Sequence, residues 1–392
     1  MDATITFFPV DCGDMALIRL ADPDNTAILI DVDIRAAADD PVDSTRDVAR
    51  DLRHRLPRDD RGRPYVDAFL LSHPDKDHCA GLEKHFHLGP MAEYPDDHKP
   101  DPEKKIVIRE IWSSPLVFRR ASKNYVLCSD AKAFNREAKR RVRRYRDGIG
   151  DTDGERILIL GEDESGKTDD LGAILVCAGD VFSRINGRTN EYFQARLLAP
   201  LPCADDDEED LLSKNQSSTI LNMQLASSAL RLDSCRFLMG GDAEVAVWER
   251  VWDRNKDTPD NLAYDLLLAP HHCSWHSLSY DSWSQLREAA EVAPDARSAL
   301  GQARFGALIV SSSKPVRDDD SDPPCIRAKR EYQDILSGGS QGLFLCTGEH
   351  PNSWSPEPLE IEVTAAGPRK KAARSSAVSA VAAAAAPRAG SY

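Results

Sequence analysis

Short apolar runs, each ended by turn-forming residues, dominate the start of the chain. TITFFPV at 4–10, MALIRL at 15–20 and AILID at 27–31 are apolar or alternate between apolar and polar residues. Cys12-Gly13-Asp14 and Asp22-Pro23-Asp24-Asn25 separate them. Because this pattern is typical of β-strands joined by tight turns, it predicts a meander of strands.

The same reasoning predicts strands and helices along the rest of the chain. Strands are expected at 66–71, 106–112, 157–160, 172–177, 194–199, 217–224, 235–239, 265–268 and 306–311. Helices are expected at 44–56, 128–146, 243–254, 279–290 and 326–336. Two runs of strands, each closing with helices, favour an α/β sandwich over a strict βαβ alternation.

Two segments differ from this pattern. Residues 84–214 are rich in charge and loop formers, and we interpret them as an insertion on the core. From residue 366 onward the composition falls to Ala, Arg, Lys, Ser and Pro, which predicts a disordered tail over 366–392. The alternative for the tail is a basic arm that contacts a partner. The folded domain is therefore expected over 1–365.

The overall composition is that of a soluble globular protein. Of 392 residues, 41% are hydrophobic and 29% charged, and no apolar run approaches the roughly 20 residues that span a bilayer. The N-terminus lacks the basic start of a signal peptide, and the nine cysteines form no CxxC pair. We therefore expect reduced thiols, a cytoplasmic location and no membrane partner. A net charge of −15 argues against non-specific nucleic-acid binding by the molecule as a whole.

One short stretch carries most of the candidate chemistry. LSHPDKDHCAGL, at 71–82, places His73, Asp75, Asp77 and His78 directly after an apolar strand. Imidazole and carboxylate groups held at fixed positions are the ligands that divalent cations need. His73 and Asp75 would face one point, and Asp77 and His78 a second point nearby. The alternative is that the aspartates are turn or N-cap residues and the histidines are incidental.

This stretch resembles a known signature. His73-Pro74-Asp75-Lys76-Asp77-His78 is similar to the HxHxDH motif of the metallo-β-lactamase fold, in the HxDxDH form found in the metallo-β-lactamase domain of ComEC-type competence proteins. Further segments similar to that family follow in the same order: Asp11-Cys12-Gly13-Asp14, Ile28-Leu29-Ile30-Asp31, Asn215-Gln216-Ser217-Ser218-Thr219-Ile220-Leu221, Phe237-Leu238-Met239-Gly240-Gly241-Asp242-Ala243-Glu244 and Ala269-Pro270-His271-His272-Cys273-Ser274-Trp275-His276-Ser277. The resemblance spans residues 4–277 and leaves out the insertion and the tail.

The resemblance implies a four-layer αββα sandwich with two divalent metal ions at one edge of its sheets. His73 and Asp75 would hold one ion, and Asp77 and His78 the other. Asp242 would bridge the two ions, and His271 or His272 would complete the second ion's shell. The sequence leaves open which of these two histidines is the ligand.

The chain also departs from the family pattern. Asn215 stands where many active members carry a histidine, and Cys273 stands where the family usually has glycine. We expect Asp11, Asp14, Asp31 and Asn215 to surround and orient the ligands rather than to bind metal. The oxygen-rich ligand set favours Mn²⁺ or Mg²⁺ relative to zinc, and the expected cofactor is two divalent ions, Mn²⁺ or Zn²⁺ with Mg²⁺ as a further candidate.

The implied activity is that of a metal-dependent hydrolase, a phosphodiesterase or nuclease that uses a hydroxide activated by two metals on DNA or RNA. Asp75, Asp77 and Asp242 would hold or orient the nucleophile. His276 would protonate the leaving oxygen in place of a histidine that the family carries further along.

The expected substrate contacts lie on a basic helix at 136–146, where Arg140, Arg141, Arg143 and Arg144 would meet phosphates. The alternative is a salt-bridged surface neutralised by the acidic run at 204–210, which could also occlude the site. Two other functions remain open. One is hydrolysis of a small molecule such as a cyclic nucleotide or an ester. The other is a metal-stabilised regulatory or interaction component of a bacterial defence system, with a protein partner from the same operon.

Overall fold

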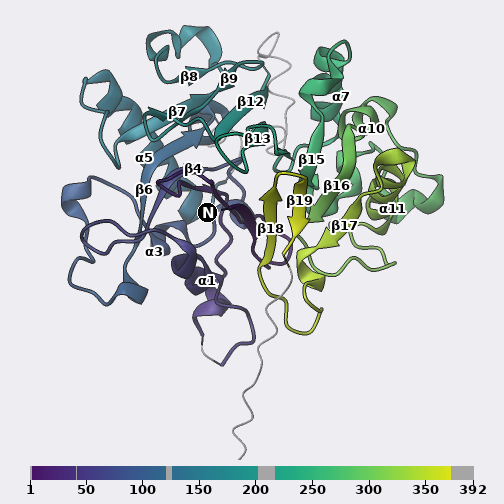
Figure 1. Cartoon of the computed structure of the whole chain (residues 1–392), viewed down its shortest axis with the longest axis horizontal. Coiled ribbons are helices and arrows are strands. Elements are labelled where there is room, and N and C mark those ends of the chain that lie inside the picture. Colours follow the sequence, from purple (N-terminus) through teal and green to yellow (C-terminus); the bar gives the residue numbers. More distant parts are fainter. Residues whose placement is uncertain (1, 41, 121–125, 202–216, 372–392) are drawn as a thin grey trace, which may run out of the picture.

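The computed structural model describes residues 2–40, 42–120, 126–201 and 217–371 (Figure 1). The strands are β1 (Ala3–Phe7), β2 (Ala16–Arg19), β3 (Ala27–Ile30), β4 (Tyr65–Leu70), β5 (Phe86–His87), β6 (Ile106–Ser113), β7 (Arg156–Leu160), β8 (Leu175–Val176), β9 (Val181–Phe182), β10 (Arg184–Ile185), β11 (Arg188–Thr189), β12 (Phe193–Ala199), β13 (Ile220–Leu225), β14 (Cys235–Met239), β15 (Tyr264–Leu268), β16 (Ala303–Ser311), β17 (Leu343–Cys346), β18 (Leu359–Thr364) and β19 (Gly367–Lys370). The helices are α1 (Val48–Arg55), α2 (Lys76–Cys79), α3 (Leu82–His85), α5 (Ser129–Arg146), α7 (Val245–Asn255), α8 (Pro270–Cys273), α9 (Trp283–Leu286), α10 (Pro294–Leu300) and α11 (Ile326–Ile335). The chain is therefore of the mixed α/β class that the sequence predicts.

The strands form two large mixed sheets. The first runs in the order β19-β18-β1-β2-β3-β4-β6-β7-β8, with β5 beside β6. Its strands from β3 to β8 are parallel, and those from β19 to β3 are antiparallel. The second runs in the order β17-β16-β15-β14-β13-β12-β9 and is parallel from β14 to β17. A separate hairpin pairs β10 with β11.

Alternation along the central strands divides their side chains between two environments. In β4, Ala68 and Leu70 belong to a core that both sheets share, whereas Phe69 belongs to a core on the other face of the first sheet. In β14, Phe237 joins the shared core and Leu238 joins a core on the far face of the second sheet. Since successive strand residues point to opposite faces, each sheet is covered on both sides.

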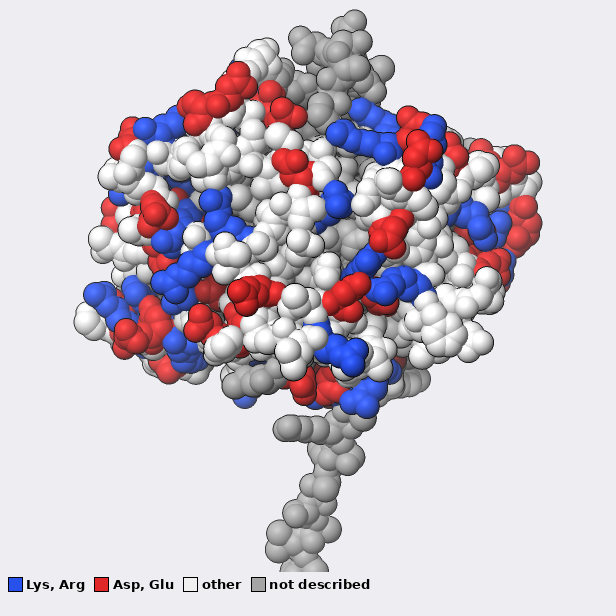
Figure 2. All heavy atoms as spheres, turned by 45° about the horizontal axis from the view of Figure 1, so that its top comes forward, with Lys and Arg blue, Asp and Glu red and all other residues white. Residues whose placement is uncertain are grey.

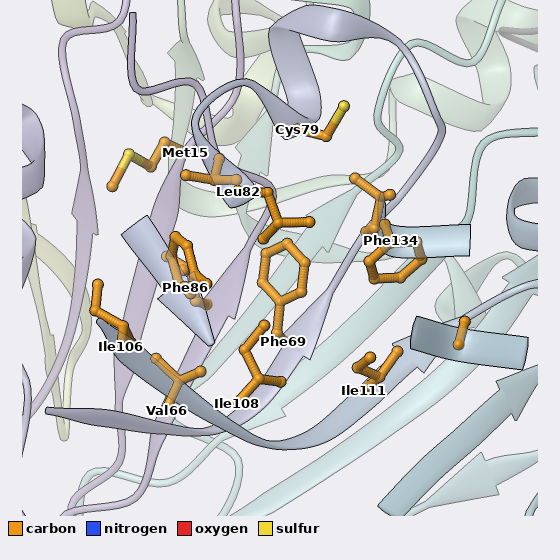
Figure 3. Close-up of a cluster of buried hydrophobic side chains, with 14 of the residues drawn as sticks. Met15, Val66, Phe69, Cys79, Leu82, Phe86, Ile106, Ile108, Ile111 and Phe134 are labelled. Atoms are coloured by element: carbon orange, nitrogen blue, oxygen red, sulfur yellow. The ribbon is translucent and has the colours of Figure 1, made fainter. Parts of the chain in front are cut away.

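Helices cover the two outer faces. Side chains of α1 and α5 pack on the first sheet, and those of α7, α10 and α11 pack on the second, on opposite sides of the molecule (Figure 1). Figure 3 shows part of the first outer core, where Phe134 of α5 meets Phe69 of β4, with ring centroids 6.0 Å apart. Cys79, at the end of α2, lies in this same core.

The parallel strands of both sheets end at the candidate metal centre. Asp31 follows β3, His73 lies just beyond β4, Asp242 follows β14 and His271 follows β15. Asp14 precedes β2, which runs antiparallel to β3 and so begins at the edge where β3 ends. Crevices at the carboxyl ends of parallel strands are the usual position for functional groups in α/β proteins.

Two predictions of domain organisation are corrected. Residues 84–214 are not an insertion outside the core, because β6 and β7 extend the first sheet and β12 extends the second. Residues 367–370, predicted as part of a disordered tail, form strand β19. Gly367, with φ of +110°, reverses the chain so that β19 pairs with β18, and Arg369 forms an ion pair with Glu362. The acidic run at 204–210 lies outside the described residues.

Most predicted elements are present near their expected positions, such as the strand at 235–239 and the helix over 129–146. The helix expected over 279–290 is wrong. Only the four residues of α9 form an α-helical turn, which ends where Arg287 adopts a φ of +52°. The strands β17 and β18 and helix α10 were not predicted.

Candidate metal centre

Four buried side chains bring ligand atoms together at the junction of the two sheets. One atom each from Asp14, His78, Asp242 and His272 lies within 4.8 Å of the other three, so this group could hold a metal ion. All four residues are at most 3% exposed. They come from the loop before β2, from α2, from the loop after β14 and from α8.

The carboxylate of Asp242 lies between two sets of imidazoles. Its Oδ1 is 3.0 Å from Nε2 of His78 and 3.4 Å from Nε2 of His272. Its Oδ2 is 3.4 Å from Nε2 of His73 and 3.6 Å from Nε2 of His271. Each oxygen therefore faces its own pair of histidines. The two adjacent histidines, which the sequence could not separate, serve different oxygens.

The spacing on the Oδ1 side fits a bound cation. The Nε2 atoms of His78 and His272 are 3.3 Å apart, and Asp77 Oδ2 lies 3.4 Å from Nε2 of His272. Ligand atoms placed tetrahedrally at about 2.1 Å from a central ion are about 3.4 Å apart. Asp242 Oδ1 and the two Nε2 atoms thus lie 3.0–3.4 Å from one another, which are the separations of a ligand shell.

Several buried polar atoms in the centre have no hydrogen-bond partner among the described residues. They are Oδ1 of Asp14, Nε2 of His73, Oδ1 of Asp242, Nδ1 of His271 and Nδ1 of His272. Leaving one such atom unsatisfied costs about 1–3 kcal/mol, so buried polar groups are normally paired. Their concentration at one place supports a ligand-binding role for the residues present.

The backbone around the histidines is unusual. His271, His272 and Cys273 are consecutive non-glycine residues with φ of 49°, 52° and 70°. Left-handed conformations of this kind cost energy and collect at functional sites. The turn is held by hydrogen bonds from His271 N to Gly241 O at 3.0 Å and from Ser274 N to His271 O at 2.8 Å. It aims the two imidazoles at different oxygens of Asp242.

Asp31 orients one of the imidazoles. Its Oδ2 accepts a hydrogen bond of 2.8 Å from Nδ1 of His78, which leaves Nε2 of His78 facing Asp242. The carboxylate of Asp31 also accepts from the amide of Ser72 at 2.7 Å, and the side chain is fully buried. A carboxylate behind a metal-ligating histidine fixes its tautomer and direction.

The carboxylates and imidazoles stabilise one another's charged forms. Burial raises the pKa of the Asp242 carboxyl, but the charges of His78 and His272 outweigh burial and hold the pKa well below its ordinary value. Burial lowers the pKa of His78, and the charges of Asp242 and Asp31 more than reverse this effect. So much buried negative charge needs positive charge beside it, whether from imidazolium groups or from a cation.

The other predicted residues of the motif and its surroundings lie as follows. Asp75 is the partly buried residue that precedes α2, and Asp77 reaches His272. His276 is 44% exposed on its side chain, and its Nε2 lies 3.9 Å from Asp322 Oδ2. Asp11 forms an ion pair with Arg35. Asn215 lies outside the described residues.

The basic helix is used differently from the prediction. Arg141 is 1% exposed and donates to Glu137 and to the carbonyls of Arg156 and Ile108. The prediction that it contacts a substrate is therefore wrong. Arg140 pairs with Glu137 and Glu155. The positive charge of Arg140 is therefore neutralised by Glu137 of the same helix and by Glu155, which precedes β7.

Of the remaining predicted contacts, Arg144 pairs with Glu155, and Arg143 is exposed. Arg141, by contrast, can be buried because its guanidinium satisfies several acceptors at once.

The sequence predicted that Asp14 orients the ligands, whereas the structure places it among the residues that could hold a metal ion. Asp33 was not predicted as part of the centre. It is 5% exposed, and burial raises its pKa to about 7. The signal for both was present, since Asp14 ends a Gly-containing turn and Asp33 repeats the aspartate of Asp31 two residues on. Gly13 permits this approach, because a Cβ there would lie 2.5 Å from Asp33 Oδ2 and 2.8 Å from Asp77 O.

Comparisons with protein-family models, curated proteins and solved structures found no match to this chain. Across the described residues, none of the helices combines the length and the apolar character needed to cross a membrane.

Proposed function

We propose that the chain is a metal-dependent phosphodiesterase of the metallo-β-lactamase fold, similar to the nuclease domain of ComEC-type proteins. The observation that carries this proposal is the position of Asp242, whose two carboxylate oxygens face separate pairs of histidines at 3.0–3.6 Å. Such an arrangement suits a carboxylate shared by two cations.

The arrangement of layers supports the proposal. Two sheets share a core and carry helices on their outer faces, which is the layer order of an αββα sandwich. The residues of the HxDxDH motif lie at the edge where strands of both sheets end. The side chains of the centre come from loops of both sheets, and packing the two sheets against each other brings them together.

Each side chain has a chemical role in this proposal. Asp14, His78 and His272, with Asp77 beside them, would hold one ion, and His73 and His271 would hold the other with Asp242 between them. Divalent ions bound there would lower the pKa of water and stabilise negative charge on a phosphoryl group. Asp31 keeps the tautomer of His78 that presents Nε2 to the ion.

Arg35 supplies a positive charge near the centre. It pairs with Asp11, its side chain is one-third exposed, and its charge acts on the carboxyl of Asp33. A guanidinium in this position could contact a phosphate oxygen and offset the repulsion between an anionic diester and the acidic centre.

The size of the substrate is a second question, and one observation favours a small one. The arginines that would follow a polynucleotide along α5 are mostly paired with Glu137 and Glu155. Acidic and basic side chains are interspersed over the face shown in Figure 2, among the residues that are coloured there. A cyclic or short nucleotide diester is therefore the second candidate beside DNA or RNA.

One assay series tests the proposal. Full-length protein would be loaded with Mn²⁺ and supplied with bis(p-nitrophenyl) phosphate, a cyclic dinucleotide, single-stranded DNA and RNA. We expect hydrolysis that is lost in Asp242→Ala and Asp77→Ala and is retained in Asp233→Ala, a control on the surface near β14. Absence of diester hydrolysis by protein that retains Mn²⁺ would overturn the proposed activity, and hydrolysis that survives both substitutions would overturn the assignment of the centre.

A further inference from the structure

Two cysteines lie side by side next to the metal centre. Cys79 Sγ and Cys128 Sγ are 3.6 Å apart, although the residues are 49 positions apart in the chain. Cys79 ends α2, directly after His78, and Cys128 caps the N-terminus of α5. Cys79 is fully buried and Cys128 is partly buried. This pair therefore has one thiol that a small oxidant can reach and one behind it.

The pair belongs to no metal cluster that the described residues form, because the group of possible ligands found there contains no cysteine. The neighbouring groups instead favour nucleophilic sulfur. Cys128 Sγ accepts a hydrogen bond of 3.4 Å from the amide of Ala131, in the first turn of the helix. This bond and the thiol of Cys79 lower the pKa of Cys128 to about 6, with the hydrogen bond from Cys79 contributing most. Thiols at helix N-termini with such neighbours are the reactive ones.

Contacts of Cys79 and of the first turn of α5 connect the cysteine pair to the segment that carries Asp77 and His78. Cys79 Sγ also lies 3.1 Å from the carbonyl oxygen of Asp75, which is a second acceptor within reach of its single thiol proton. The carboxylate of Asp130, in the first turn of α5, accepts from the amide of Glu83 at 2.8 Å and from Gly81 at 3.4 Å. The carbonyl of His78 accepts from Val32 N at 2.9 Å. A change in the position of Cys79 therefore reaches the backbone that carries Asp77 and His78.

We propose that Cys79 and Cys128 are a site of reversible oxidation, at which a peroxide forms a disulfide that weakens metal binding by the adjacent loop. The sulfur of Cys128 attacks one peroxide oxygen, the O–O bond breaks, and the departing hydroxide takes a proton to become water. Cys128 is thereby oxidised to a sulfenic acid. The sulfur of Cys79 then attacks that sulfur, the S–OH bond breaks, and the hydroxyl leaves as water with the proton of Cys79.

The geometry explains the coupling. A disulfide needs its sulfurs about 2.05 Å apart, so the pair must close by about 1.5 Å. Cys79 must move away from Asp75 O, which lies 3.1 Å from its sulfur, and draw the short helix α2 toward α5. Disturbing groups that orient metal ligands typically lowers metal affinity about tenfold to a hundredfold. The thiol chemistry stands apart from the proposed activity, whereas the effect on affinity rests on the proposed metal centre.

The test uses full-length reduced protein treated with hydrogen peroxide, followed by catalase, alkylation and peptide mass spectrometry. We expect a peptide linking Cys79 to Cys128, lighter by two hydrogens, that a dithiol reductant reverses. Cys128→Ser should abolish it and Cys235→Ser should not. At pH 6.5, iodoacetamide should alkylate Cys128 about tenfold faster than Cys177, whose pKa is raised by burial. Oxidation that leaves both thiols open to alkylation, or that links Cys79 to another cysteine, would overturn the site.

Titration with Mn²⁺ tests the coupling. Oxidised wild-type protein should bind Mn²⁺ at least tenfold more weakly than reduced protein, and Cys128→Ser should show no such difference after the same treatment. Equal affinities of the oxidised, cross-linked protein and the reduced protein would overturn the coupling. Failure of both forms to bind Mn²⁺ would instead count against the metal centre itself.

Discussion

Asp31 accepts a hydrogen bond of 2.8 Å from Nδ1 of His78, and this bond turns the opposite nitrogen of the imidazole toward Asp242. Asp31 follows β3 of the first sheet, whereas Asp242 follows β14 of the second. The imidazole thus connects the two sheets at the edge where their parallel strands end. The proposed metal centre depends on this alignment, and the first prediction tests it.

Asp31→Asn should lower Mn²⁺ affinity about tenfold to a hundredfold while the fold is retained. Asparagine keeps the size of the side chain and tolerates the φ of 52° at this position, but its amide no longer provides a charged acceptor for the Nδ1 proton of His78. Titration calorimetry with Mn²⁺ measures the effect, and circular dichroism checks the fold. Unchanged affinity in a folded variant would contradict the orienting role.

Gly13→Ala should disturb the centre through the backbone. The added Cβ would lie 2.5 Å from Asp33 Oδ2 and 2.8 Å from Asp77 O, and overpacking of this kind costs about 1–3 kcal/mol. We expect a lower melting temperature and a smaller stabilisation by Mn²⁺ in a thermal shift assay. Gly172→Ala is the matched control, since nothing lies within 4 Å of its Cβ position and its φ is −49°. Equal behaviour of the two variants would contradict the close approach at Gly13.

The ion pairs on α5 are expected to contribute to the stability of the fold rather than to substrate binding. Burial raises the pKa of Glu137, but the hydrogen bond from Arg140 and the charge of Arg141 outweigh it and lower the pKa from 4.5 to about 2. Because the folded-state pKa is depressed, the ionised carboxylate contributes stability that is full above about pH 4.5 and is lost as the pH falls toward 2.

Urea unfolding of wild-type protein and Glu137→Gln over pH 3–6 checks this contribution. The free energy difference between them should be constant near pH 6 and should shrink as the pH falls. Glu137→Ala should lose about 3 kcal/mol near pH 6, because it leaves the buried guanidinium of Arg141 without its carboxylate. A difference that grows on acidification would have the wrong sign for a depressed pKa.

The sequence predicted those parts of the site that local spacing determines. His73, Asp77 and His78 follow a strand within six positions, and the adjacent His271 and His272 follow another. Such patterns survive in the structure because the end of a strand and the turn after it are local. The sequence could not separate His271 from His272, since their directions depend on three left-handed residues held by Gly241 and Ser274.

Long-range packing accounts for what was missed. Asp14 enters the centre because its amide bonds to the carbonyl of Asp77, more than sixty residues away. The run of arginines on α5 looked like a substrate surface because Glu155, which pairs with Arg140 and Arg144, comes from a separate segment. Strand β19 was taken for tail because its composition is basic, and only its pairing with the glutamates of β18 explains it.

Equilibrium dialysis against Mn²⁺ measures whether the two oxygens of Asp242 serve two groups of histidines. If they do, wild-type protein and the surface control Asp233→Ala bind two tightly held equivalents, His73→Ala binds one, and folded Asp242→Ala binds none at the same free metal concentration. Retention of both equivalents by Asp242→Ala would contradict the shared role of its carboxylate.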